Sequence, residues 1–216
     1  MAGKITALKL QKRDKERVNV FLDDVYAFAV TVVVAARLRK GQYLSDEEIA
    51  ALKLGDERDK AFHRAIRLLA MRPRSQAEVV RYLRDKGYTE EVVEDVVKRL
   101  LEQQYLDDEA FARFWLEDRE RFRPKGERAL RYELRQKGIA DHIIDPLVAD
   151  LDEEAAAWAA LEKKLYQWRS VTKDGLKRKV ISFLSRRGFN YEIANNAFRR
   201  ACETLNIEDT SEFEDI

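Results

Sequence analysis

Few residues in this sequence have the types and the spacing that a catalytic or metal site requires. His63 and His142 are far apart in the sequence, and neither has a partner at metal-ligand spacing, so we interpret each as a surface or packing residue. Cys202 lies near Phe198 and Ala201 on the last expected helix, and we interpret it as a small core or half-buried residue rather than a reactive thiol. We therefore expect no metal site and no catalytic histidine or cysteine.

Phosphate-binding loops and paired carboxylates give no catalytic site either. No two of the eight glycines are two residues apart, and none have the P-loop spacing, so neither a Gly-x-Gly loop nor a P-loop exists in this chain. The pairs Asp23-Asp24 and Asp107-Asp108 lie directly beside periodic segments, where turn and N-cap roles explain them. Nucleotide chemistry of these two kinds is therefore excluded, and we expect no cofactor.

Basic residues are the remaining group that could recognise a ligand. The chain carries 41 Lys and Arg against 40 Asp and Glu, a net charge of +1, so attraction to a polyanion must come from local asymmetry. Arg113 to Lys137 holds nine basic and five acidic residues, and Lys163 to Arg200 holds eleven basic and two acidic ones. These runs are either solvated helix faces or a strip that suits DNA or an acidic protein surface.

The composition favours a helical protein without disulfides or membrane spans. The chain has 216 residues, 45% of them hydrophobic, with eight glycines and three prolines, which argues against a loop-rich all-β fold and against a disordered chain. A single cysteine cannot form an internal disulfide, and the first residues lack a signal-peptide pattern, so we expect a cytoplasmic protein. The longest apolar run, Ala27 to Ala36, is shorter than the roughly 20 residues that cross a bilayer, so we expect no membrane partner.

The first part of the chain has the two-residue period of β-strands. Leu8 and Leu10 flank Lys9, and the aliphatic residues Val18, Val20 and Leu22 alternate with Asn19 and Phe21. The charged segment Lys12 to Arg17 between them predicts a hairpin tip, and Asp23-Asp24 predicts a second turn into a strand at Val25 to Val30. We expect a small N-terminal antiparallel β-meander of three strands, which must pack on another element to be stable.

Two short helices are expected after the meander. The first carries Val32 to Leu38 and closes near Gly41. The second begins at Ser45, which forms a capping-box pattern with Glu48, and runs to about residue 54. We place this N-terminal domain at residues 1–55.

From residue 56 onward the helical pattern repeats. Three segments share the form Leu-x-x-(Lys/Arg)-Gly followed by an apolar residue, and their glycines, Gly87, Gly138 and Gly188, are 51 and 50 residues apart. Each motif predicts a helix, a tight turn at a glycine with left-handed backbone, and a second helix. The basic residue before each glycine favours the negative end of the first helix dipole.

A third helix is expected after each of the first two motifs, at about 107–121 and 152–168. This gives three-helix repeats at residues 56–122 and 123–169, a shorter repeat at 170–205, and an acidic tail at 206–216. Three units that contact mainly their neighbours predict a mainly α fold, an elongated and curved solenoid of three tandem three-helix repeats. Such a surface favours binding over catalysis.

The repeat motifs and the residues around them closely resemble the RecX regulatory proteins of bacteria. The β-like start also resembles the N-terminal extension of RecX proteins from Gram-positive bacteria. The resemblance implies a non-enzymatic negative modulator of RecA that binds the RecA filament on single-stranded DNA, limits its growth or promotes its disassembly, and reduces strand exchange, ATP hydrolysis and coprotease activity. It also implies a role in homologous recombination, DNA repair and the SOS response. The matching segments are Ala65–Glu78, Leu83–Tyr88, Tyr105–Ala112, Lys125-Gly126 and Leu134–Ile139.

The candidate interface residues come from charge alone, because the resemblance supplies no catalytic residues. Six lie beside the repeat glycines, and three more form a basic run in the last repeat. Helix C-capping and compensation of the helix dipole are their alternative roles. Reversing the charges of Arg186 and Arg187 is expected to weaken filament binding without unfolding the protein. The nine candidates are Arg84, Lys86, Arg135, Lys137, Lys177, Arg178, Lys179, Arg186 and Arg187.

Two alternatives remain open from the sequence. One is a sequence-neutral DNA-binding module that acts without RecA and binds single- or double-stranded DNA directly, with an affinity that falls steeply with salt. The other is a scaffold for a different helical partner. A net charge near zero is compatible with a monomer, which is the state that we expect.

Overall fold

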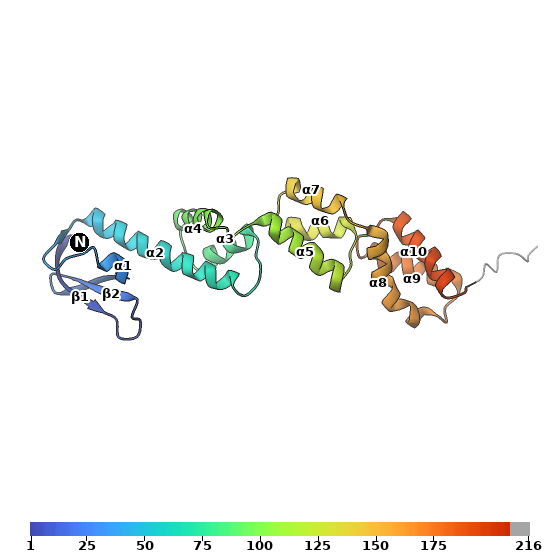
Figure 1. Cartoon of the computed structure of the whole chain (residues 1–216), viewed down its shortest axis with the longest axis horizontal. Coiled ribbons are helices and arrows are strands. Elements are labelled where there is room, and N and C mark those ends of the chain that lie inside the picture. The colour runs from blue at the N-terminus through green and yellow to red at the C-terminus, as the bar shows by residue number, and fades with distance from the viewer. Residues whose placement is uncertain (208–216) are drawn as a thin grey trace, which may run out of the picture. The chain divides into compact units, whose positions relative to one another are not determined.

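The computed structural model describes residues 1–207, and the expected acidic tail lies outside the described residues from Glu208 onward. The described part contains ten helices and four strands, which confirms a mainly α protein with a small N-terminal antiparallel sheet (Figure 1). It divides into two compact units. The first holds Met1–Arg72 and Val79–Leu106, and the second holds Pro73–Glu78 and the residues from Asp107 onward.

The N-terminal sheet contains the predicted meander and one further strand. Asp23 and Asp24 both have positive φ angles, 45° and 65°, and form the tight turn between the second and third strands. The unpredicted strand is two residues long, too short to show a periodicity, and it pairs with the free edge of β1. The spatial order is β3-β2-β1-β4, with β1 at Gly3–Leu10, β2 at Arg17–Leu22, β3 at Val25–Thr31 and β4 at Tyr43–Leu44.

The helices after the meander differ from the expected ones. Helix α1 (Val32–Ala35) is a single turn that ends before Leu38. Helix α2 (Asp46–Leu69) begins at the predicted Ser45 capping box but continues for 24 residues instead of ending near residue 54. Gly55 lies inside α2 because packing of the helix segments before and after it outweighs the cost of a helical glycine, about 1 kcal/mol. The expected domain boundary at residue 55 therefore falls within a continuous helix.

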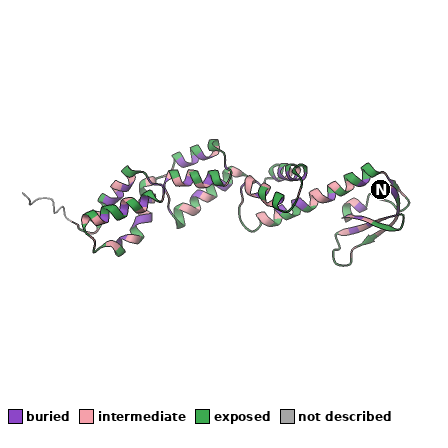
Figure 2. Ribbon diagram, turned by 180° about the vertical axis from the view of Figure 1, so that it is seen from behind, coloured by how far each residue is buried: buried purple, intermediate pink, exposed green. Residues whose placement is uncertain are grey.

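Each half of α2 packs in a different core. Ile49 belongs to the core under the sheet, whereas Ala61, Phe62 and Ala65 belong to the core of the first three-helix domain. That domain also contains α3 (Gln76–Asp85) and α4 (Glu90–Glu102), and five apolar residues of α4 are buried in it. Buried and exposed residues alternate along the helices (Figure 2), as expected for amphipathic helices that each bury one face.

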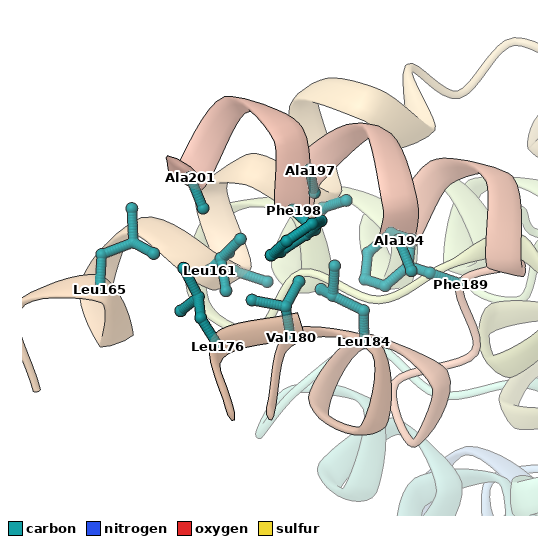
Figure 3. Packing of buried hydrophobic residues seen from close by; sticks show 12 residues of the cluster. Leu161, Leu165, Leu176, Val180, Leu184, Phe189, Ala194, Ala197, Phe198 and Ala201 are labelled. Carbon is teal, nitrogen blue, oxygen red and sulfur yellow. The ribbon is translucent and has the colours of Figure 1, made fainter. Parts of the chain in front are cut away.

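Two further three-helix domains follow in the second unit. Their cores are separate, and Figure 3 shows side chains of all three helices of the last domain meeting around Phe198 and Leu161. The second domain contains α5 (Asp108–Phe122), α6 (Glu127–Gln136) and α7 (Asp141–Ala149). The third contains α8 (Glu153–Trp168), α9 (Lys173–Ser185) and α10 (Tyr191–Thr204).

The expected phase of the repeats requires correction. Phe111 and Leu116 of α5 are buried with residues of α6 and α7, so α5 opens the second domain instead of closing a first repeat at 56–122. In the same way α8 packs on α9 and α10, so the third domain has three full helices. The expected repeats at 123–169 and 170–205 shift accordingly. A periodicity fixes the length of a repeat, but only tertiary contacts decide where it begins.

The glycine turns of the three motifs form as predicted. Gly87, Gly138 and Gly188 have φ angles of 83°, 79° and 89°, in the left-handed region where residues with a Cβ atom are strained. The last two turns also pack closely against the preceding helix pair, because Gly138 lies against Ala77 and Gly188 against Ala129. A Cβ atom at Gly87 would meet nothing within 4 Å.

Candidate polyanion-binding surface

Two of the nine candidate cations are paired across their own turns. Arg84 donates two hydrogen bonds to Glu90, at 2.8 and 2.6 Å, and Arg135 donates one to Asp141 at 2.7 Å. Both pairs join the residues three positions before and three positions after the motif glycine. The paired guanidiniums lower the pKa of the Glu90 and Asp141 carboxyl groups. Arg84 and Arg135 therefore fasten helix–turn–helix units, and their charge is largely compensated.

The residues directly before the glycines have unequal roles. The Lys137 Nζ atom lies 2.9 Å from Glu78 and 4.9 Å from the centre of the Trp115 ring. Arg187 lies over the Phe183 ring at 4.5 Å and donates a hydrogen bond to the Pro124 carbonyl oxygen at 3.2 Å. Both side chains thus hold neighbouring segments of the second unit together.

Lys86, in contrast, is exposed and lies over Tyr82 of its own helix, with its Nζ atom 5.5 Å from the ring centre. Of the three basic residues directly before the motif glycines, Lys86 is the one with no described contact outside its own helix–turn–helix unit.

The contacts of Arg187 affect the charge-reversal test. Reversing the charge of Arg187 is expected to disturb packing as well as any interface, so a test of the interface needs residues other than Arg186 and Arg187.

Carboxylates also neutralise most of the basic run in the second domain. Glu133 accepts hydrogen bonds from the Trp115 indole and the Arg119 guanidinium, both at 2.8 Å, and forms an ion pair with Lys125. Arg131 pairs with Glu127 and with Asp145. The local excess of basic residues between 113 and 137 is therefore mainly structural.

Glu133→Gln is expected to lower the unfolding free energy of the second domain by about 1.5 kcal/mol at neutral pH. Burial raises the pKa of Glu133, but hydrogen bonds from Lys125, Trp115 and Arg119 outweigh burial and lower it overall. A lowered pKa in the folded state stabilises the protein above the unfolded pKa, about 4.3, and this contribution is lost as the pH falls through the folded value.

The measurement is urea unfolding of the wild type and of Glu133→Gln between pH 7 and pH 3. The difference in unfolding free energy between the two proteins should stay constant down to about pH 5 and shrink below about pH 4. A difference that is independent of pH over the whole range would show that the Glu133 charge contributes nothing.

The third domain differs from the other two because four of its exposed candidate cations have no ion pair within the described residues. Within residues 1–207, Lys177, Arg178, Lys179 and Arg186 have no carboxylate at ion-pair distance, although Arg186 donates to the Ser182 hydroxyl group. All four are exposed. Successive residues of a helix turn by about 100°, so the run 177–179 covers a wide arc of the α9 surface. Three of the nine candidates on α9, and Arg186 at its C-cap, thus form a basic surface without carboxylate partners in residues 1–207.

Two further basic residues lie next to this surface, beside α10. Lys173 and Arg199 line, with Lys177, a hollow of about 790 Å³ at α9 and α10. Neither was among the nine candidates, although the four-residue spacing of Lys173 and Lys177 was a visible signal that they share a helix face. Cys202 lines the same hollow and is half-buried, one of its two predicted placements, and burial raises the pKa of its thiol.

Other kinds of site find no support in the described part of the chain. Residues 1–207 contain no cluster of three or more His, Cys, Asp or Glu side chains that could hold a metal ion. None of their helices has the length and apolar character that a membrane crossing requires. The uncompensated cations of α9 are therefore the strongest candidate site.

Comparison with protein families gives four matches that follow the chain in order. Residues 3–45 match the family described as the regulatory protein RecX N-terminal domain. Residues 61–100, 107–146 and 152–198 match the first, second and third three-helix domains of RecX. The last three ranges agree with the helix grouping found in the cores.

Whole proteins with similar sequences carry the same name. Regulatory protein RecX of Bacillus subtilis is 36% identical over 211 residues, which cover 95% of this chain and 80% of that protein. Regulatory protein RecX of Listeria monocytogenes serotype 4b is 31% identical, covering 97% of this chain and 80% of the other.

Two solved structures share the fold. A crystal structure of regulatory protein RecX superposes with a TM-score of 0.73 at 30% identity and covers 95% of this chain and 100% of that chain. The crystal structure of RecX from Lactobacillus salivarius has a TM-score of 0.61 at 21% identity, covering 68% of this chain and 97% of the other.

Proposed function

Because this chain belongs to the RecX family of regulatory proteins, we propose that it binds the RecA filament on single-stranded DNA and limits filament growth. Binding would reduce ATP hydrolysis by RecA, strand exchange and coprotease activity. The protein would act by occupying filament or DNA contacts, without catalysis of its own. It would work as a monomer in the cytoplasm, within recombinational DNA repair and the SOS response.

The observation that supports this proposal is a run of three exposed cations on α9 without a described ion pair. Lys177, Arg178 and Lys179 are exposed, consecutive and without carboxylate partners among the described residues. A nucleoprotein filament presents phosphates and acidic side chains, and unpaired surface cations gain most from such a partner because no internal ion pair has to break first. Arg84 and Arg135 are less suited, because each already pairs with a carboxylate.

The test is ATP hydrolysis by RecA on single-stranded DNA while this protein is titrated from far below RecA to an equal amount. We expect strong inhibition at well below one copy per RecA, since a protein that blocks filament growth or promotes disassembly affects many protomers at once. Light scattering should show filament shortening over the same range.

One outcome would favour the DNA-binding module instead. No effect on ATP hydrolysis at equal amounts, together with tight binding to bare DNA that weakens steeply with salt, would mean that the cations bind phosphates without RecA. Weak binding to both would leave a scaffold for another partner.

A further inference from the structure

The hollow at α9 and α10 has the chemical character of a peptide-binding site. Its basic groups are Lys173, Lys177 and Arg199, and Glu203 contributes a single carboxylate. Phe198 supplies an aromatic surface, and the Lys177 Nζ atom lies 5.9 Å from the centre of its ring. A site with several cations beside an apolar floor fits an acidic peptide that carries an aromatic residue.

The end of α10 turns the chain toward this hollow. Asn206 has a φ angle of 51°, and its N–H group donates to the Glu203 carbonyl oxygen at 3.2 Å. The Ile207 N–H group donates to the Cys202 carbonyl oxygen at 3.0 Å. These two bonds form a Schellman motif, which reverses the chain direction at a helix end. Asn206 and Ile207 consequently line the hollow themselves.

The sequence that follows Ile207 has the complementary composition. Residues 208–216 contain five carboxylate side chains, no lysine or arginine, and the apolar residues Phe213 and Ile216. Nine residues span at most about 30 Å when extended, so the segment can reach across the hollow from Ile207. We propose that the hollow at α9 and α10 is a binding site for an acidic peptide, and that residues 208–216 of the same chain occupy it.

Occupancy follows from the attachment of the segment to the site. A short tether gives the segment an effective concentration of about 1 mM at the hollow. If the same segment binds as a free peptide with a Kd of about 0.1 mM, the tethered segment occupies the hollow about 90% of the time. A polyanion that needs the same cations would then bind about tenfold more weakly. The acidic segment therefore regulates the basic surface of α9, and this second step rests on the proposed function.

Peptide binding is tested without RecA or DNA. Fluorescently labelled peptide 208–216 is titrated with the protein truncated after Ile207, and fluorescence anisotropy is followed at low salt. We expect a Kd of about 0.1 mM. A peptide with its five acidic residues changed to the corresponding amides should bind at least fivefold more weakly.

Matched variants locate the site. Lys177→Glu and Arg199→Glu should each weaken peptide binding at least fivefold, whereas Arg178→Glu, with the same charge change on α9 outside the lining of the hollow, should weaken it less than twofold. The assignment would be overturned if the three variants weakened peptide binding equally, or if the amide peptide bound as tightly as the acidic one.

The full chain provides the second arm. Truncation after Ile207 should raise the affinity for an oligothymidylate about tenfold at 10 mM salt and much less at 150 mM, because the Debye length falls from about 30 to 8 Å. The effect should not depend on protein concentration, and dependence on it would place the segment on a second copy and overturn occupancy within one chain. If the peptide binds but neither oligothymidylate nor RecA does, the proposed function fails and the peptide site stands.

Discussion

Gly188→Ala is expected to lower the unfolding free energy of the third three-helix domain by about 2–5 kcal/mol. Alanine costs about 1–2 kcal/mol in the left-handed conformation of this residue, whose φ angle is 89°. Its Cβ atom would also lie 2.4 Å from the Ala129 Cβ atom and 2.5 Å from the Ala129 nitrogen. Overpacking against backbone costs a further 1–3 kcal/mol or so, since α6 must move.

Gly87→Ala is the matched control, because this glycine has a similar φ angle of 83° but open space around it. It should cost only the conformational term, about 1–2 kcal/mol. The destabilisation by Gly138→Ala can be tested for rescue by a second substitution, since the one atom that the new Cβ would approach closely is the Ala77 Cβ atom at 2.3 Å. The double variant Gly138→Ala/Ala77→Gly should recover part of the loss.

Hydrogen exchange resolved by segment is the suitable measurement, because a chain with several cores need not unfold in one step. Amides of α9 and α10 should exchange much faster in Gly188→Ala, with smaller changes in the first unit. Similar losses for Gly188→Ala and Gly87→Ala would show that contact with Ala129 adds nothing to the cost.

Arg178→Glu/Lys179→Glu is expected to weaken binding to RecA filaments by about 30- to 100-fold at low salt. The variant replaces two exposed cations with anions, so two favourable contacts become repulsive. Neither side chain has a described carboxylate partner, and neither belongs to the core of the third domain, so the fold should persist.

The matched control is Lys12→Glu/Lys15→Glu in the hairpin of the N-terminal sheet. It makes the same change of net charge at two exposed residues of the other unit. Filament co-sedimentation at several salt concentrations should separate the two variants, and the dependence on salt should flatten for the α9 variant. Equal losses would mean that total charge, and not the α9 surface, sets the affinity.

Local features of the fold could be predicted because their causes are local. The Ser45 capping box, the Asp23-Asp24 turn and the left-handed glycines each depend on residues within a few positions of one another. The spacing of the motifs likewise gave helix–turn–helix units and a mainly α fold. The resemblance to RecX proteins rested on the same short segments, and the family comparisons confirmed it.

The site was predicted less well, since nine cations looked equivalent in sequence. The partners of Arg84 and Arg135 stand six positions downstream, so those pairs had a visible signal. No such signal existed for Arg187, because its partner Pro124 lies 63 positions away. Sorting structural cations from free ones required the contacts between helices.

By itself the sequence determined the three helix–turn–helix units, the β-meander and the RecX family, because hydrophobic periodicity, capping and glycine turns act over a few residues. The tertiary structure alone decided that α2 continues through Gly55, that α5 and α8 open their domains, and that Lys177, Arg178 and Lys179 have no carboxylate partner within residues 1–207. These outcomes depend on which surfaces are buried together and which carboxylates reach which cations, and both are settled only when segments distant in the chain pack side by side.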